Sequence, residues 1–136
     1  MSVPPGTSVV TFIPIRNMSR AVKFYTKTVG GKLITRGTGK MKDFWACVRF
    51  GKDDVWLIAP QKREKRTLAY CTFVVRNIER FVKGLQEKGV KFQRPDRMSW
   101  ETKVVGPIAY DPSGAAAFFK DSEGNLMMIW HNHPSM

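Results

Sequence analysis

The stretch that decides the fold is IRNMSRAVKFY, residues 15–25, because the chain repeats its pattern as VRNIERFVKGL, residues 75–85. In each copy the apolar residues recur at spacings of i, i+3, i+4 and i+7, which places them on one side of a helix. They are Met18, Ala21, Val22 and Tyr25 in the first copy, and Ile78, Phe81, Val82 and Leu85 in the second. The repeat therefore predicts two amphipathic helices, at 18–29 and 78–88.

The residues that flank both predicted helices indicate where the helices begin and end. Asn17 and Asn77 stand just before the first striped residue, where a side-chain oxygen can accept hydrogen bonds from the first turn. Gly30 and Gly89 stand just past the last turn, where a left-handed residue commonly stops a helix. Each helix thus carries its own start and stop signals.

Strand-like segments, rich in β-branched and aromatic residues, surround each predicted helix. They are 9–15, 32–36, 44–50 and 55–59 in the first half, and 68–75, 90–93, a poorly defined strand within 103–110, 115–120 and 126–131 in the second. Each half reads β-α-β-β-β, so the predicted fold class is α+β. Because units of about 60 residues are marginal alone, we expect a single domain over 1–136, with repeats at about 8–60 and 68–133 and a basic connector at 61–67.

The composition is that of a water-soluble globular protein, with 43% hydrophobic residues. No apolar run approaches the roughly 20 residues that a membrane span needs, so we expect no membrane partner. The start, MSVPPGTS, has neither the basic nor the apolar region of a secretory signal, which favours a cytoplasmic location. In that reducing compartment, Cys47 and Cys71 are expected to be buried free thiols.

The formal net charge of +12 is the most unusual bulk property of the chain. Such a charge suits nucleic acid, an acidic surface or an anionic small molecule as a partner. The one dense basic run, QKREKR at 61–66, contains no aromatic residue on which a base could stack. We interpret it as a solvated connector, and we do not expect a nucleic-acid partner.

Three motifs carry a resemblance to a known family. They are IRNMSRAVKFY with Val29-Gly30-Gly31 after it, VRNI at 75–78 with Lys88-Gly89-Val90 after it, and FKDSEGNL at 119–126. With them, roughly residues 8–131 resemble the vicinal oxygen chelate superfamily, which includes glyoxalase I, methylmalonyl-CoA epimerase, extradiol dioxygenases and the bleomycin resistance proteins. Two departures are Asn17, where the family often has Asp, and Ser122, where it often has Pro. The resemblance implies two βαβββ units that form a cupped mixed sheet around a ligand-binding groove, and it implies a homodimer.

Enzymes of that superfamily usually hold one divalent metal ion with four side chains, one from the first and one from the last strand of each unit. The resemblance puts these positions at Val10, Leu57, Tyr70 and Met128. None of them is His, Glu, Gln or Asp, the ligands that such a Lewis-acid centre uses. We therefore expect a metal-free protein without a cofactor.

His131 and His133 are the only histidines in the chain. Their spacing places both rings on one side of a strand, where they could chelate a metal ion. Because only three residues follow His133, we favour a frayed chain end as the explanation. If one of them has a role, it is His131, at the rim of the groove and able to transfer a proton near neutral pH.

If the metal positions face the groove, alternation along the strands predicts its lining. The predicted ligand-binding residues are Phe12, Leu57, Tyr70, Met128, Trp130 and His131, with Val10, Val55, Ala59, Thr72 and Leu126 beside them. The opposite parity, which includes Ile13 and Cys71, would face the helices. An apolar, aromatic lining with one phenol suits a planar ligand, and the basic chain favours a neutral or anionic one. The alternative is a packed core with no ligand.

Three classes of function stay open at this point. The first is a metal-free protein of the bleomycin-resistance type that binds a small molecule. The second is a glyoxalase-like lyase or isomerase whose base is Tyr70, His131 or an unplaced acid. The third is a basic accessory protein for nucleic acid or another acidic partner. Its surface would be formed by Arg20, Lys23 and Lys27 on one helix and by Arg80, Lys83 and Glu87 on the other.

Overall fold

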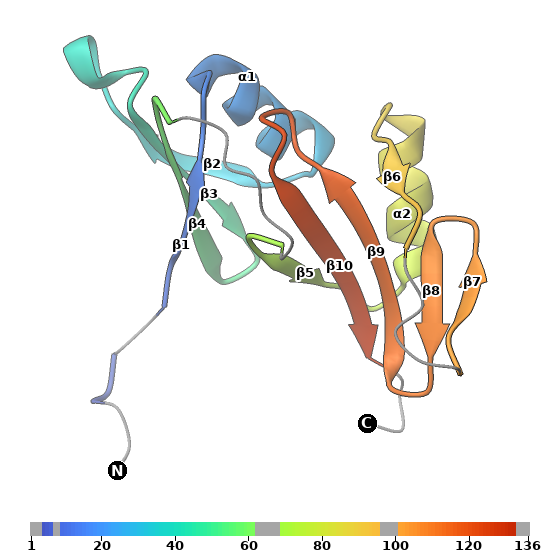
Figure 1. Cartoon of the computed structure of the whole chain (residues 1–136). Coiled ribbons are helices and arrows are strands. Elements are labelled where there is room, and N and C mark those ends of the chain that lie inside the picture. Colours follow the sequence, from blue (N-terminus) through green and yellow to red (C-terminus); the bar gives the residue numbers. More distant parts are fainter. Residues whose placement is uncertain (1–3, 7–8, 62–68, 96–100, 133–136) are drawn as a thin grey trace. The chain divides into compact units, whose positions relative to one another are not determined.

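The structure is a computed structural model, and it describes residues 4–6, 9–61, 69–95 and 101–132. The chain divides into two compact units, Met1–Lys62 and Arg63–Met136, and each contains one mixed β-sheet and one main α-helix (Figure 1). The predicted α+β class is therefore confirmed. Within the described residues, no helix is long and apolar enough to cross a membrane.

The first unit has the predicted order β-α-β-β-β. Its elements are β1 (Thr11–Pro14), α1 (Met18–Lys23) with a π-helical extension (Phe24–Thr28), β2 (Lys32–Arg36), a short 3₁₀ turn (Gly39–Met41), β3 (Trp45–Phe50) and β4 (Asp53–Ile58). The strands lie in the order β1-β4-β3-β2, with β1 and β4 parallel and the other neighbours antiparallel. The first strand of the unit therefore pairs with the last.

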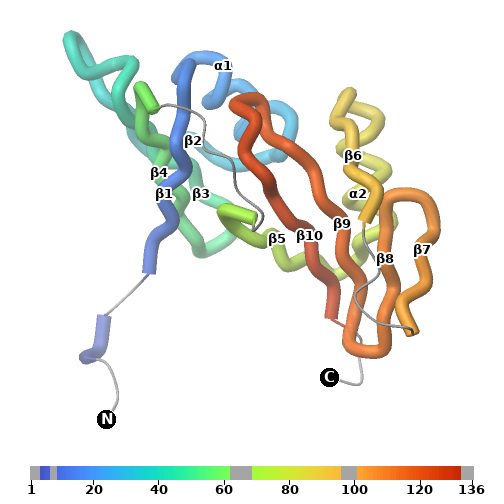
Figure 2. Tube along the Cα trace, in the orientation of Figure 1, coloured from blue at the N-terminus to red at the C-terminus, as the bar shows by residue number. Residues whose placement is uncertain are grey.

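The second unit repeats this plan and adds a hairpin. Its elements are β5 (Thr72–Val74), α2 (Ile78–Glu87), β6 (Phe92–Gln93), β7 (Lys103–Val105), β8 (Ile108–Asp111), β9 (Gly114–Lys120) and β10 (Leu126–Asn132). Strand β10 pairs with β5 in parallel and with β9 in antiparallel. The other edge of β9 pairs with β6 along one part and with β8 along another (Figure 2). The poorly defined strand expected within 103–110 is the β7–β8 hairpin, which turns at Gly106 with a φ of 60°.

Both helices begin at the predicted residues, Met18 and Ile78, and each ends one residue before the predicted end, at Thr28 of the π-helical extension and at Glu87. Asn17 Oδ1 accepts from the backbone N–H of Arg20 at 3.0 Å, and Asn77 Oδ1 accepts from that of Arg80 at 3.1 Å. Gly30 and Gly89 follow with positive φ values of 98° and 91°. The first helix ends in a wide π turn, in which the N–H of residue 29 donates to the carbonyl oxygen of residue 24. Both caps satisfy donors that the first helical turn cannot satisfy itself.

Each helix covers one face of the sheet in its own unit. Helix α1 packs on β3 and β4, and α2 packs on β9 and β10. The core of each unit contains fully buried side chains from its helix and its sheet. They include Ile13, Leu57 and Tyr25 in the first unit, and Ile78, Phe119 and Ile129 in the second. We call the opposite face of each sheet, which its own helix does not cover, the open face.

Candidate functional site

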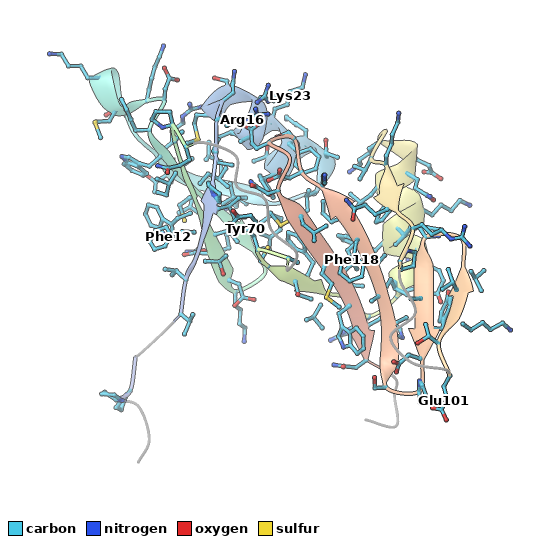
Figure 3. All side chains as sticks on the ribbon, viewed as in Figure 1. Phe12, Arg16, Lys23, Tyr70, Glu101 and Phe118 are labelled. Atoms are coloured by element: carbon cyan, nitrogen blue, oxygen red, sulfur yellow. The ribbon has the colours of Figure 1, made fainter. Side chains whose placement is uncertain are left out.

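The open face of the first sheet carries aromatic side chains. Phe12 on β1 is 61% exposed, whereas its neighbour Ile13 is completely buried on the helix side. Figure 3 shows Phe12 projecting from β1. Across the parallel pairing, Phe12 lies opposite Trp56 of β4, and Trp56 in turn lies opposite Cys47 of β3. Cross-strand partners share a face, so these three side chains belong to the open face.

The prediction that Leu57 shares a face with Phe12 is wrong. Leu57 lies opposite Ile13, and it is 0% exposed because it points into the core under α1. Val55 and Ala59, which have the same parity, are buried as well. The register of β1 with β4 puts Trp56 and Ile58 on the open face in their place.

The open face of the first sheet combines an aromatic pair with an ion pair. The rings of Trp45 and Trp56 lie with their centroids 5.7 Å apart at an interplanar angle of 40°. One step along the sheet, Arg49 and Asp54 face each other across β3 and β4, with Nε 2.7 Å from Oδ1 and Nη2 3.1 Å from Oδ2. This two-point contact lowers the pKa of Asp54 and raises that of Arg49. The face therefore offers a ring surface beside a guanidinium whose charge is compensated.

In the second sheet, the register agrees with the alternation predicted along β5 and β10. Thr72 lies opposite Met128, and Val74, which is 67% exposed, lies opposite Trp130. On the other side Met128 faces Phe118 of β9, which Figure 3 labels. Leu126, Met128, Phe118 and Trp130 are all half-buried. Apolar surface thus remains accessible along β10.

Tyr70 precedes β5, and its backbone N–H donates to the carbonyl oxygen of Leu126 at 2.9 Å. It is half-buried and two residues before Thr72, in keeping with the predicted parity. Contact of Tyr70 with a ligand stays a prediction. Trp45 of β3 lies opposite Ile58 and so belongs to the open face of the first sheet, and Trp100 lies outside the described residues.

The prediction that His131 lies at the rim of the groove, together with Trp130, is wrong. His131 follows Ile129 in parity, so it lies on the helix side of β10, near Glu79 in the first turn of α2. There the Tyr110 hydroxyl donates to Glu79 Oε1 at 2.9 Å. The Glu79 backbone N–H, this hydroxyl and the charge of His131 lower the pKa of the Glu79 carboxyl. His133 lies outside the described residues.

The residues at the family's metal positions do not fit a divalent ion. The two units share one strand register, because Phe12 lies opposite Trp56 in the first and the equivalent Thr72 lies opposite Met128 in the second. Trp56, and not Leu57, is therefore the counterpart of Met128. Indole and thioether groups are not ligands for the hard or borderline ions expected there. Within the part of the chain that the structure describes, no three His, Cys, Asp or Glu side chains form a group that could hold a metal ion.

Both cysteines are free thiols, Cys47 buried and Cys71 half-buried. Burial raises the pKa of Cys71 to about 11, and the charge of Asp121 adds to the effect. Burial also raises the pKa of Cys47, with a further contribution from Asp54. Raised pKa values keep thiols protonated, so neither residue is an activated nucleophile.

Sequence reasoning missed several residues of the open faces, among them Trp56, Ile58, Arg49 and Phe118. A signal for the first three was present in the hairpin at Gly51-Lys52, because a two-residue turn pairs Phe50 with Asp53 and so Arg49 with Asp54. Opposite charges at paired positions support the same register. Phe118 follows from the pairing of β9 with Met128.

Comparison with known proteins places this architecture. The model of the Glyoxalase/Bleomycin resistance protein/Dioxygenase superfamily matches residues 8–129. No curated protein matches the sequence.

Several solved structures have a similar fold. TnmS3, an antibiotic binding protein from Streptomyces sp. CB03234, aligns with a TM-score of 0.70 and 20% identity over 94% of this chain and 98% of that one. The genomically encoded fosfomycin resistance protein FosX from Listeria monocytogenes aligns with a TM-score of 0.72 and 12% identity, over 98% of this chain and 95% of that one. A putative glyoxalase family protein from Bacillus anthracis aligns with a TM-score of 0.69 and 18% identity, over 98% of this chain and 99% of that one. At these identities the likeness concerns the fold.

Proposed function

This chain belongs to the glyoxalase/bleomycin resistance protein/dioxygenase superfamily, and from that premise we propose that it is a metal-free protein that binds a planar, neutral or anionic small molecule. Aromatic and apolar side chains on the open face of each sheet supply a surface for such a ligand. The ligand is held and released without chemical change.

The observation that carries this proposal is the accessibility of large apolar side chains on the open faces. Phe12 is 61% exposed on the first sheet, and Phe118, Met128 and Trp130 are half-buried on the second. Aromatic side chains left partly uncovered on a sheet face suit stacking against a flat ring.

The relatives and the net charge support the kind of ligand. One similar structure is described as an antibiotic binding protein and another as a fosfomycin resistance protein, so proteins of this fold take small molecules. The chain itself carries a net charge of +12. A basic protein repels a cationic ligand and attracts an anionic one at long range, so a neutral or anionic ligand is favoured.

The metal-free character follows from the donor chemistry of the positions. Val10, Trp56, Tyr70 and Met128 together offer a single oxygen donor, the Tyr70 hydroxyl. We expect purified protein to hold less than one equivalent of Zn, Ni, Fe or Mn, measured by elemental analysis. A stoichiometric ion bound from these strands would contradict the proposal.

The test uses three probes of one shape: naphthalene-2-sulfonate, naphthalene-2-sulfonamide and naphthalen-2-ylmethylammonium, which are anionic, neutral and cationic. Isothermal titration should show the anion and the neutral probe binding more tightly than the cation. Trp130→Ala should weaken the neutral probe more than Tyr70→Phe, whose effect is up to about tenfold through one hydrogen bond. Unchanged affinity in both variants would place the site elsewhere or show that the faces are only packing surfaces.

We also propose that two chains pair to form a homodimer, as the resemblance to the family implies. Large apolar side chains outside the proposed binding surface, such as Leu33 and Val105, are exposed in one chain, at 37% and 54%. Sedimentation equilibrium should give twice the mass of the 15.5 kDa chain. A monomer at all accessible concentrations would contradict pairing.

A second candidate, a basic accessory protein for nucleic acid, is favoured by one observation. Residues 1–42 contain no Asp or Glu, and exposed cations recur in them at i, i+4, i+7 and i+11, namely Arg16, Arg20, Lys23 and Lys27. Figure 3 labels Arg16, which precedes α1, and Lys23, at the end of α1. These four cations along α1 form what we call the α1 stripe. Retention on DNA separates this candidate from the first.

A further inference from the structure

The indole ring of Trp130 is fixed along its own strand. Its Nε1–H donates to Oδ1 of Asn132 at 2.6 Å. Residues two apart on a strand share a face, so both side chains lie on the open face of the second sheet. The hydrogen bond directs the ring along β10 toward residue 132.

The neighbouring strand leaves room for this ring because residue 114 is glycine. Gly114 lies opposite Asn132 on β9, and a Cβ placed there would collide with the backbone carbonyl oxygen of His131 and come within 2.6 Å of Cζ2 and 2.9 Å of Cη2 of Trp130. The benzene half of the indole therefore lies directly on the Gly114 backbone. Opposite Trp130 itself is Ala116, which is completely buried.

Glycine within a strand has a cost, because it weakens the strand and often marks a close approach of another group. Two groups approach Gly114: the backbone carbonyl oxygen of His131 on β10 and the Trp130 ring. A ring laid flat on a strand buries one of its faces and presents the other. The ring orientation thus explains the acceptor at 132 and is one of two reasons for glycine at 114.

We propose that Gly114 and Asn132 are positioning residues that hold the Trp130 indole flat against β9 and β10, as a preformed stacking platform for the ligand. This inference rests on the proposed function and deepens it. A ring that is already immobile loses little further freedom on binding, so affinity for a flat ligand is higher than with a mobile indole.

The same hydrogen bond defines what the platform recognises. Because Asn132 already accepts from Nε1–H, the indole offers the ligand its ring face and not a hydrogen-bond donor. The ligand at this position is therefore an aromatic or conjugated ring system selected by flatness. A ligand that needs a donor from Trp130 is disfavoured.

The first measurement concerns the ring without any ligand. The four tryptophans give four indole signals in ¹⁵N-labelled protein, and Trp130→Phe identifies the one from residue 130. In wild type its N–H order parameter should be near the rigid value of about 0.85. Asn132→Leu, which has a similar size but no acceptor, should bring it below about 0.6, and Asn132→Asp, which keeps an acceptor, should restore it.

The second measurement is the affinity for naphthalene-2-sulfonamide, a neutral probe that is insensitive to the charge change in Asn132→Asp. Asn132→Leu should weaken it by about threefold to tenfold, and Asn132→Asp should stay within about twofold of wild type. Gly114→Ala should also displace the ring signal. Because this variant can disturb the strand, the Asn132 pair decides the outcome, with the backbone amide spectrum as the control for folding.

The two proposals fail in different ways. An indole as rigid in Asn132→Leu as in wild type would overturn the positioning role, whatever the affinity. A mobile indole with unchanged affinity would overturn the platform. If wild type bound none of the naphthalene probes, the proposed function would fall and the platform with it, even if the order parameters behaved as expected.

Discussion

Trp56 stands opposite Phe12 across the parallel pairing of β1 with β4. The second unit repeats this relationship as Met128 opposite Thr72. The repeat in the sequence is therefore also a repeat in strand register, and it assigns each residue of β4 and β10 to a face. By this register, Trp56 belongs to the proposed ligand-binding face and Leu57 to the core.

Truncation of these two neighbours should separate stability from binding. Leu57→Ala removes a completely buried side chain and should lower the free energy of unfolding by about 2–5 kcal/mol, with probe affinity of the folded protein unchanged. Trp56→Leu removes half of an aromatic pair on the open face, so it should weaken naphthalene-2-sulfonamide while costing less stability. Urea denaturation and calorimetric titration check both, and weaker binding by Leu57→Ala alone would reverse the assignment.

The sequence predicted the helices well because their signals are local. The spacing of apolar residues and the caps at Asn17 and Asn77 lie within a few residues of each other, and no distant contact can shift them. The β7–β8 hairpin was seen only as a poorly defined strand, although Gly106-Pro107 is a turn signal.

The face of a strand depends on register, and register is less local. A shift of one residue moves every side chain to the other side, and this is the error made for Leu57. The two-residue turn at Gly51-Lys52 sets the register of β3 with β4, whereas the predicted strands 44–50 and 55–59 leave four residues between them. For His131 the alternation along β10 alone indicates the correct face, opposite to that of Trp130, because the strand continues to Asn132 without a bulge. The error there was not one of register.

Cys71 should resist alkylation in the folded protein. Its pKa is raised from 9.0 to about 11, so at pH 8 its thiolate is about 100-fold scarcer than in the unfolded chain. Iodoacetamide labelling followed by peptide mass spectrometry should show at least that difference between native protein and protein in urea. Equal rates in both states would contradict the burial of the thiol.

The same pKa shift predicts how stability depends on pH. Between about pH 9 and 11 the unfolded chain releases the Cys71 proton and the folded chain keeps it. The folded state then binds more protons, so stability falls as pH rises through this window. Cys71→Ala should show a smaller fall from pH 9 to 11 in thermal denaturation.

The α1 stripe should bind DNA only at low salt. Four phosphate contacts give a slope of at most about −3.6 in a plot of log affinity against log salt, which is about a 100-fold loss between 50 and 200 mM. We therefore expect the protein to elute from a DNA column below about 0.15 M salt. Sequence-selective binding at that ionic strength would favour the accessory-protein candidate instead.

Helix α2 supplies a matched control for the stripe. The repeat aligns Arg20 with Arg80 and Lys23 with Lys83, but α2 also carries Glu79 and Glu87. The double changes Arg20→Glu with Lys23→Glu and Arg80→Glu with Lys83→Glu alter the net charge equally. The α1 pair should lower the eluting salt more, whereas equal shifts would mean that only net charge matters.

The Arg49–Asp54 ion pair should limit the affinity for anions on the first sheet. Asp54 occupies Nε and Nη2 of Arg49 at 2.7 and 3.1 Å, beside the Trp45–Trp56 rings. Asp54→Asn leaves the guanidinium charge uncompensated, so naphthalene-2-sulfonate should bind about threefold to tenfold more tightly. Naphthalene-2-sulfonamide should not change, because it carries no charge. Asp53→Asn makes the same charge change with the helix-side parity of Val55, and an equal gain there would show a general charge effect.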